Sequence, residues 1–369
     1  MKFALRELVR RPGRFVTATV ILTLIAVLLM FLGGLLDGLI RSSTGAIRAQ
    51  TADAIVFSET SRASFIRSRI DPDVRAAIEA ADGVDEVGGL GVVLLGARVP
   101  GNAPRDLANV ALWGYELAPA GVPAPPAPGE AYADELLQAD GVKVGHELLI
   151  GPARTPITVI GWVSDTAYNG QGGLWTELDT WRDVLSANRP DAVLADGTVQ
   201  ALAISGPDGA ADAIAAADAA ADGRAYALTI DEAINAIPGI EAQRNTFNQI
   251  LGVTVVIAMV VIALFFALLT VERIGMYGVL KALGARSSTL FGGVVLQAVA
   301  VTAAAALLGV VVAVALDLAI PAGSIPYELS PARVLGSVAS LLVAAVIGSA
   351  FSLRRVLRID PASAIGGTT

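Results

Sequence analysis

The side chains that usually carry catalysis are scarce in this sequence. Its 369 residues include no cysteine and a single histidine, His146. Thiol nucleophiles, redox pairs and thiolate zinc sites are therefore excluded. The chain also has no HExxH motif, no GxxxxGK(S/T) phosphate-binding loop and no choice of histidines for a Ser-His-Asp set. We expect no catalytic residue, no metal site and no cofactor bound by this chain; if ATP drives it, another chain binds the ATP.

The segment from Thr270 to Arg286, TVERIGMYGVLKALGAR, has the most informative pattern. As one helix it would present an apolar stripe made of Met276, Val279, Leu280 and Leu283. The opposite face would hold Ile274, Gly278, Lys281 and Ala285. Two interpretations follow from this periodicity: an interfacial helix that covers its own bundle, or a surface whose small residues let a partner approach closely.

Four long uncharged runs indicate a membrane protein. The chain is 54% hydrophobic and 16% charged, with a mean hydropathy of +0.64, too apolar for an ordinary soluble globule. The runs hold 22 residues between Arg14 and Asp37, 27 between Arg244 and Glu272, 30 between Arg286 and Asp317, and 20 between Arg333 and Arg354. Each can cross a hydrocarbon core of roughly 30 Å as a helix. The stretch between the first two runs is long enough for a core of its own.

The basic residues predict that both termini are cytoplasmic. They flank the spans in three segments: Lys2, Arg6, Arg10, Arg11 and Arg14; Arg273, Lys281 and Arg286; Arg354, Arg355 and Arg358. Because Lys and Arg favour the cytoplasmic side, the large loop is expected outside. That loop, residues 41–246, holds 14 basic and 28 acidic residues, a sign that disfavours nucleic-acid binding.

The amino-terminal segment is predicted to be a short interfacial helix followed by an uncleaved anchor. The first uncharged run is longer than the apolar part of a usual secretory signal. Ahead of it, apolar and basic residues fall on separate helical faces, and Pro12-Gly13 is expected to break the helix before Phe15. Asp37 and Asp317, at the predicted outer ends of spans, are expected to be solvated, and Gly33-Gly34 offers a small surface for helix contact.

The outer loop reads as alternating helices and strands. Helices are expected from Asp71-Pro72 to about Asp82-Gly83 and over 207–222. Strands are expected at 91–95, 146–150, 156–163 and 201–205, and a polyproline-like connector at 121–129. Thr229 and Glu232 have capping-box spacing. From there the chain can run as helix into the second span, interrupted at most near Pro238-Gly239, which would connect the outer domain mechanically to the membrane.

Several segments resemble the FtsX/MacB-type ABC transporter permease family, and together they cover nearly the whole chain. ER-x4-GVLKALGA, from Glu272 to Ala285, is similar to that family's cytoplasmic coupling segment. The tail RRVLRIDPASAI and the opening LRELVRRPGRF resemble family ends, and GEAYADELLQADGVKVGHELLI, from Gly129 to Ile150, resembles part of the MacB-type periplasmic core domain. DevC-like exporters, with a permease of this size and a separate ATPase, look nearest.

The sequence departs from the family pattern at three positions. Met276-Tyr277 stands where relatives often have Glu-Ile, and Gln297 stands where they often have Glu. His146 occupies a position where Asp is common, so a turn explains it better than a ligand role does.

The resemblance implies a permease subunit, a homodimer with a second copy of the chain, that works with a separate ABC ATPase. ATP and Mg would be bound by that ATPase, and an extracytoplasmic adaptor or substrate-binding protein could join the outer domain. The implied function is export or extraction of a lipid, lipoprotein, peptide or drug. The alternative is an FtsX-like signalling subunit that regulates a cell-wall hydrolase. The implied ATPase-coupling residues are Glu272, Arg273, Gly278, Val279, Leu280, Lys281, Ala282, Leu283, Gly284 and Ala285.

The predicted fold class is membrane α-helical, with four transmembrane helices and an α/β extracytoplasmic domain inserted between helices 1 and 2, in a bacterial plasma membrane. The predicted parts are an interfacial helix 1–14, spans 15–40, 247–271, 292–320 and 334–353, a MacB-like core domain 41–246 that ends in a stalk helix, a coupling segment 272–291, an external turn 321–333 and a cytoplasmic tail 354–369.

Overall fold

The computed structural model describes residues 12–192, 194–272, 274–284, 286–320 and 325–356, and it divides the chain into two compact units. Among the described residues, the helical unit takes 12–38, 244–320 and 327–356. The sheet unit takes 39–243 together with 325–326. The predicted fold class, four membrane helices with an α/β domain inserted between the first two, is confirmed.

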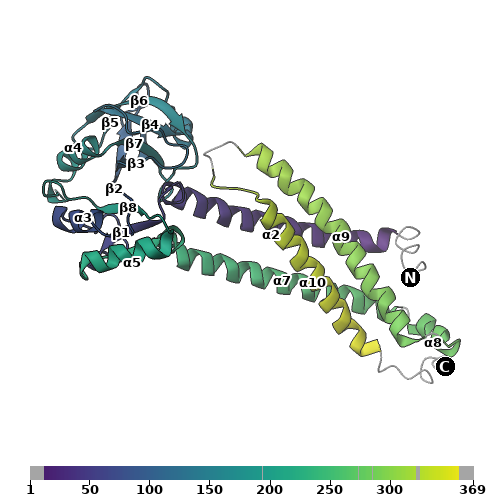
Figure 1. Ribbon diagram of the computed structural model, residues 1–369. Coiled ribbons are helices and arrows are strands. Elements are labelled where there is room, and N and C mark those ends of the chain that lie inside the picture. Colours follow the sequence, from purple (N-terminus) through teal and green to yellow (C-terminus); the bar gives the residue numbers. More distant parts are fainter. Residues whose placement is uncertain (1–11, 193, 273, 285, 321–324, 357–369) are drawn as a thin grey trace. The chain divides into compact units, whose positions relative to one another are not determined.

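Four helices of the described chain are long and apolar enough to cross a membrane: α2 (Pro12–Arg48), α7 (Ile240–Val271), α9 (Ser287–Ala319) and α10 (Pro331–Val356) (Figure 1). A fifth, α8 (Ile274–Ala282), is short. Because about 20 residues suffice for a bilayer core, the 37 residues of α2 extend well beyond it. The helix includes Pro12 and Gly13, and the expected break between the interfacial helix and the span falls at the edge of the described residues. The interfacial helix itself falls almost entirely outside the described residues.

All four long helices contribute to the core of the helical unit. One cluster joins Phe15 and Leu22 of α2 to Phe266 of α7, Ala298 of α9 and Ala345 of α10. Small residues allow close contacts, since a Cβ added to Gly309 of α9 would lie 2.7 Å from the Cβ of Ala26 in α2. Large apolar side chains face outward on every helix, including Leu24, Leu264, Leu307 and Leu335. These outward residues suit contact with lipid tails.

The sheet unit contains nine strands: β1 (Ala54–Ser58), β2 (Glu86–Arg98), β3 (Leu107–Tyr115), β4 (Glu130–Asp134), β5 (Glu147–Ile150), β6 (Thr155–Val163), β7 (Gly172–Glu177), β8 (Ala201–Ser205) and β9 (Ala225–Thr229). Their order is β3-β7-β4-β6-β5-β2-β8-β1-β9, and β3 also pairs with β2. Six strands, from β2 through β3, β7, β4, β6 and β5, therefore close into a ring. The other three continue from β2 as an antiparallel extension.

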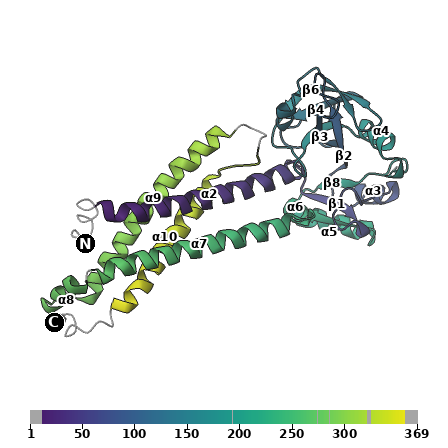
Figure 2. The same ribbon diagram turned by 180° about the vertical axis from the view of Figure 1, so that it is seen from behind.

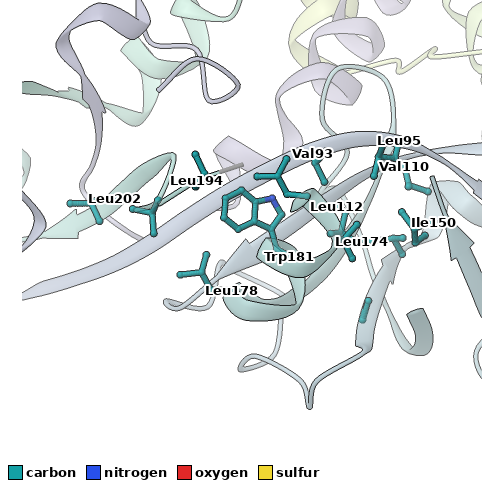
Figure 3. Close-up of a cluster of buried hydrophobic side chains, with 14 of the residues drawn as sticks. Val93, Leu95, Val110, Leu112, Ile150, Leu174, Leu178, Trp181, Leu194 and Leu202 are labelled. Carbon is teal, nitrogen blue, oxygen red and sulfur yellow. The ribbon is translucent and has the colours of Figure 1, made fainter. Parts of the chain in front are cut away.

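Four helices accompany these strands: α3 (Pro72–Glu79), α4 (Leu178–Asn188), α5 (Ala210–Ala221) and α6 (Ile230–Ala236) (Figure 2). On α4, Trp181 is fully buried among Val93, Leu112 and Leu174 (Figure 3). Glycine makes room for this indole, because a Cβ on Gly91 or Gly114 would lie within 2.5 Å of Trp181. A second cluster gathers the aromatic rings, including Trp113 stacked on Trp175 with centroids 5.4 Å apart.

Local sequence patterns predicted most of these elements. The expected strands correspond to β2, β5, β6 and β8, the expected helices to α3 and α5, and the segment 121–129 forms no regular helix or strand. Thr229 and Glu232 make both halves of the capping box at α6. The path toward the second span breaks after Ala236, where Gly239 has φ +93° before α7 begins at Ile240. The interruption near Pro238-Gly239 is therefore real, and α6 and α7 are separate helices.

Candidate coupling segment and the ion pairs at the helix ends

The predicted coupling segment is a short helix set between two turns, and not the single helix expected over 270–286. Helix α7 ends at Val271, α8 covers Ile274–Ala282, and α9 begins at Ser287. Gly284 ends the segment's helical path because its φ of +91° is a left-handed conformation that glycine adopts without steric cost. Leu283 still donates its N–H to the carbonyl of Val279 at 3.0 Å, which completes the last turn. The short helix is thus free to take a direction different from those of its neighbours.

Most of the predicted apolar stripe points away from the chain. Met276, Val279 and Leu283 are 48%, 57% and 80% exposed, whereas Leu280 is half-buried. Tyr277, on another side of α8, packs against the bundle core. The interpretation that the stripe covers its own bundle is therefore wrong for these three residues, which we call the coupling stripe. An exposed apolar surface of this kind is suited to a partner or to the membrane interface.

The remaining predicted coupling residues lie along the same segment. Glu272 is exposed in the turn after α7, and its N–H donates to the carbonyl of Leu268 at 3.1 Å. Gly278 is half-buried in α8, which also contains Lys281 and Ala282. Arg273 and Ala285 lie outside the described residues. The structure thus brings the described members together on one short stretch, and their assignment to ATPase coupling stays a prediction.

Sequence reasoning missed an ion pair that joins α2 to α10 within the helical unit. Arg333 donates from Nε and Nη2 to the two carboxylate oxygens of Asp37, at 3.1 and 2.5 Å. The hydroxyl of Ser330 donates to the same carboxylate at 3.1 Å and accepts the N–H of Arg333 at 3.2 Å. Both charged side chains are about three-quarters buried, with 24% and 25% exposed. We call Asp37, Ser330 and Arg333 the clasp; the expectation that Asp37 is simply solvated is wrong.

Glycines in α2 make the clasp possible. A Cβ on Gly33 would lie 2.3 Å from Cδ of Arg333, and one on Gly34 would lie 2.6 Å from the ring of Tyr327. The prediction that Gly33-Gly34 supports helix contact is therefore confirmed. Tyr327 also stacks on Phe31, with ring centroids 5.4 Å apart. A sequence signal existed: an acid at the end of one apolar run and a lone Arg at the start of another.

A second missed site holds the carboxyl end of α2 inside the sheet unit. Arg41 binds both carboxylate oxygens of Asp165, at 2.9 and 2.8 Å, and Arg48 binds the same carboxylate at 2.5 Å. Gly45 lies against the backbone of the loop that contains Asp165, since a Cβ added to Gly45 would be 2.7 Å from the carbonyl oxygen of Asp165. The N–H of Ala46 donates to the carbonyl of Ala167 at 3.1 Å. We call this contact between 41–48 and 165–170 the anchor.

His146 sits in a turn, as expected. Its N–H donates to the carbonyl of Lys143 at 3.0 Å, and its carbonyl accepts the N–H of Val159 at 2.9 Å. The imidazole Nδ1 is buried without a hydrogen-bond partner in the described structure. Within the ranges that the structure describes, no cluster of three or more His, Asp or Glu side chains could hold a metal ion.

Comparisons with known proteins assign the carboxyl-terminal part of the chain to a family. Residues 248–361 match the family described as FtsX-like permease C-terminal. A putative hemin transport system permease protein HrtB from Staphylococcus haemolyticus is 30% identical over 131 residues, 36% of this chain; the match spans only 37% of that relative's length. An uncharacterized ABC transporter permease of Mycobacterium tuberculosis, Rv2563, is 25% identical over 99% of both chains.

Among solved structures, the chain is similar to the periplasmic region of MacB from Actinobacillus actinomycetemcomitans. That match has a TM-score of 0.35 and 12% identity, and it covers 50% of this chain and 92% of the MacB region. Residues 248–361 are thus identified as an FtsX-like permease C-terminal domain, and the chain as a whole is similar from end to end to the mycobacterial ABC transporter permease.

Proposed function

We propose that this permease couples ATP hydrolysis in a separate ATPase subunit to movement of its sheet unit, and that the movement exports or extracts a lipid, lipoprotein, peptide or drug. In this proposal the termini and α8 are cytoplasmic and the sheet unit is extracytoplasmic, in agreement with the distribution of basic residues. The ATPase holds ATP and Mg, and two copies of the permease bind two copies of the ATPase.

The coupling stripe is the observation that carries this proposal. Three large apolar side chains are about half or more exposed between two spans: Met276 and Val279 on the nine-residue α8, and Leu283 in the turn directly after it. Burying such side chains against a protein partner contributes about 25 cal/mol per Å² of apolar area. Because turns bound α8 on both sides, a partner that binds it can displace it together with the ends of α7 and α9.

The proposal is tested by truncating the coupling stripe without disturbing the fold. Met276→Ala, Val279→Ala and Leu283→Ala together remove exposed side chains only. The matched control is Leu264→Ala, Leu268→Ala and Val271→Ala, three outward apolar residues of α7 that are 67%, 60% and 57% exposed. Each form of the full chain is purified in detergent with the ATPase subunit that co-purifies with it, and ATP hydrolysis is measured.

We expect the stripe variant to lose at least about tenfold of the ATPase stimulation, which corresponds to about 1.4 kcal/mol of coupling. The α7 control should stimulate as the wild type does. Full stimulation by the stripe variant, or failure of any ATPase to co-purify with the wild type, would contradict the proposal.

Export is distinguished from signalling by the molecule that stays bound when hydrolysis is blocked. The complex is purified with a hydrolysis-deficient ATPase, and bound molecules are identified by mass spectrometry. A bound lipid, lipoprotein, peptide or drug supports export, and hemin is a useful first compound because the HrtB relatives are named for hemin transport. A bound cell-wall hydrolase would instead favour the FtsX-like signalling function.

A further inference from the structure

A small cavity in the sheet unit gathers arginines on an otherwise acidic domain. Its volume is about 310 Å³, and Arg67, Arg69 and Arg224 line it together with the hydroxyl-bearing Thr60. The predicted outer domain, residues 41–246, has 28 acidic and only 14 basic residues, so its net charge is negative. Three guanidinium groups around one cavity therefore form a positive cluster on a negatively charged domain. A volume near 300 Å³ is at the small end of the range for organic ligands.

Arg69 is the most buried of these three arginines, and no carboxylate balances its charge among the described residues. Its guanidinium is half-buried, and Nη1 donates to the carbonyls of Ile66 and Ser68 at 2.9 and 2.6 Å. Across the described part of the chain, no carboxylate forms an ion pair with it. Burial lowers the pKa of Arg69, which reflects the free energy that desolvation of an unpaired cation costs. An anion in the cavity would offset that cost, and Nε and Nη2 are left to bind it.

The other two arginines differ in whether a carboxylate already binds them. Arg67 is exposed, and its guanidinium contacts no acidic group in the described ranges. Arg224 donates from Nη1 to the carboxylate of Asp73, which keeps the pKa of Asp73 below its usual range. A guanidinium presents a planar fork of donors that matches the two oxygens of a phosphate or carboxylate. Arg67 and Arg69, which line the same cavity, therefore both offer donors to an oxyanion bound there.

Two carboxylates on the same cavity restrict which anions fit. Glu59 is exposed, and Asp71 accepts a hydrogen bond from the hydroxyl of Thr198 at 3.4 Å. Both would repel a bare anion, but both can accept hydrogen bonds from hydroxyl or ammonium groups. The lining thus favours a molecule that carries donors beside its negative group.

From this lining we infer that the cavity binds a small organic anion whose phosphate or carboxylate contacts Arg67 and Arg69 while hydroxyl or ammonium groups contact Glu59 and Asp71. The site lies at the end of the β1–β9 ladder where Ser58 pairs with Ala225. At the other end of that ladder Ala54 pairs with Thr229, close in sequence to the end of α2 and the start of α6. The ligand can therefore bind without displacing either helix, and the inference does not depend on ATPase coupling.

Calorimetric titration of the full-length permease in detergent tests this inference, with sn-glycerol 3-phosphate as the probe. Inorganic phosphate and glycerol separate the contributions of the anion and the hydroxyl groups. We expect glycerol 3-phosphate to bind more tightly than phosphate, and glycerol not to bind. Short-chain phosphatidylglycerol distinguishes a soluble ligand from a lipid headgroup; binding of the lipid alone would overturn the inference.

Variants assign the binding to this cavity. Arg67→Gln and Arg69→Gln should each weaken glycerol 3-phosphate binding about tenfold, because each removes a charge-assisted hydrogen bond. Glu59→Gln should tighten phosphate binding, a gain that misfolding cannot produce. Arg105→Gln, an exposed arginine between β2 and β3, matches the change in net charge and should leave binding unchanged. The inference is overturned if no anion binds saturably, or if Arg67→Gln binds as the wild type does.

Discussion

The sheet unit is reached by two helices that are built differently. Helix α2 runs without a break from Pro12 to Arg48, and its last residues are held by the anchor. Helix α7 instead starts at Ile240 after a break, where Gly239 has a left-handed φ of +93°. Ile237 and Ile240, on either side of that break, are 6% and 3% exposed in the aromatic cluster. Helix α2 thus ends inside the sheet unit, where the anchor holds it, whereas α7 begins inside the sheet unit directly after a break at 237–239.

Both helices cross from one unit to the other without a break, since α2 continues past residue 38 and α7 past residue 243. They differ in what holds them to the sheet unit: ion pairs and close backbone contacts hold α2, whereas α7 begins between buried isoleucines beside a break in the helix. The predictions below test each part of this difference.

The largest effect is expected from a methyl group at the anchor. Gly45→Ala places a Cβ 2.7 Å from the carbonyl oxygen of Asp165 and 3.0 Å from the backbone of Ala167, atoms that cannot move independently. We expect the sheet unit to lose about 2–3 kcal/mol of stability, the cost of overpacking. All four tryptophans, at 113, 162, 175 and 181, belong to this unit, so tryptophan fluorescence of the full chain during unfolding reports it selectively.

Gly252→Ala is the matched control for the anchor. Gly252 is also a helical glycine, but it has no other group within 4 Å of the added Cβ. Gly252 lies in the helical unit, which holds none of the tryptophans, so this substitution should leave the tryptophan transition unchanged. Within its own helix alanine is favoured over glycine by up to about 1 kcal/mol. Equal unfolding curves for Gly45→Ala and Gly252→Ala would show that the anchor is not rigid.

A smaller effect is expected at the clasp, which holds α2 inside the helical unit. Arg333→Met keeps an apolar chain over Gly33 and leaves the partly buried Asp37 unpaired, at a cost of about 2 kcal/mol. Faster hydrogen exchange in the first turns of α10 should report the loss, while the tryptophan transition of the sheet unit stays constant. Adding Asp37→Asn should recover part of the protection; no recovery would argue that the pair is not coupled.

The smallest effect is expected at the capping box before the break at 237–239. Thr229→Ala removes the hydroxyl that accepts the N–H of Glu232 at 3.3 Å, and it should cost about 1 kcal/mol. Hydrogen exchange in α6 should rise more than exchange in 43–48, because the anchor is independent of this cap. Equal increases in both segments would contradict the proposed difference between the two connections.

The effect of the capping box should also depend on pH. Hydrogen bonds from the backbone N–H and the hydroxyl of Thr229 lower the pKa of Glu232. A lowered pKa means that the stabilisation is complete above the ordinary carboxyl pKa of about 4.3 and is lost as the pH falls through the lowered value. The difference in stability between the wild type and Thr229→Ala should therefore shrink in acid. A difference that stays constant with pH would mean that it comes only from the hydrogen bond that the hydroxyl accepts from the N–H of Glu232.

Features encoded locally could be predicted from the sequence, and features that depend on distant residues could not. The capping box, the four spans and the close approach at Gly33-Gly34 follow from neighbouring residues or helical spacing. The anchor joins Arg41 to Asp165, 124 positions away, and the clasp joins Asp37 to Arg333, 296 positions away. A local pattern can mark such charges at the ends of apolar runs, but it does not show which of them pair. In the coupling segment the apolar stripe was recognisable, but Gly284 as a helix stop and the exposed side of α8 required the structure.

Ring closure in the sheet unit has a consequence for crowding. A strand with an unpaired edge can add a strand from another molecule, which is a common route to aggregation. Because β3 pairs back to β2, β9 is the one strand among those described that has a single neighbour, and it is only five residues long. An edge this short offers few backbone hydrogen bonds to a neighbouring molecule, so sheet units that come close together have little opportunity to join into a shared sheet.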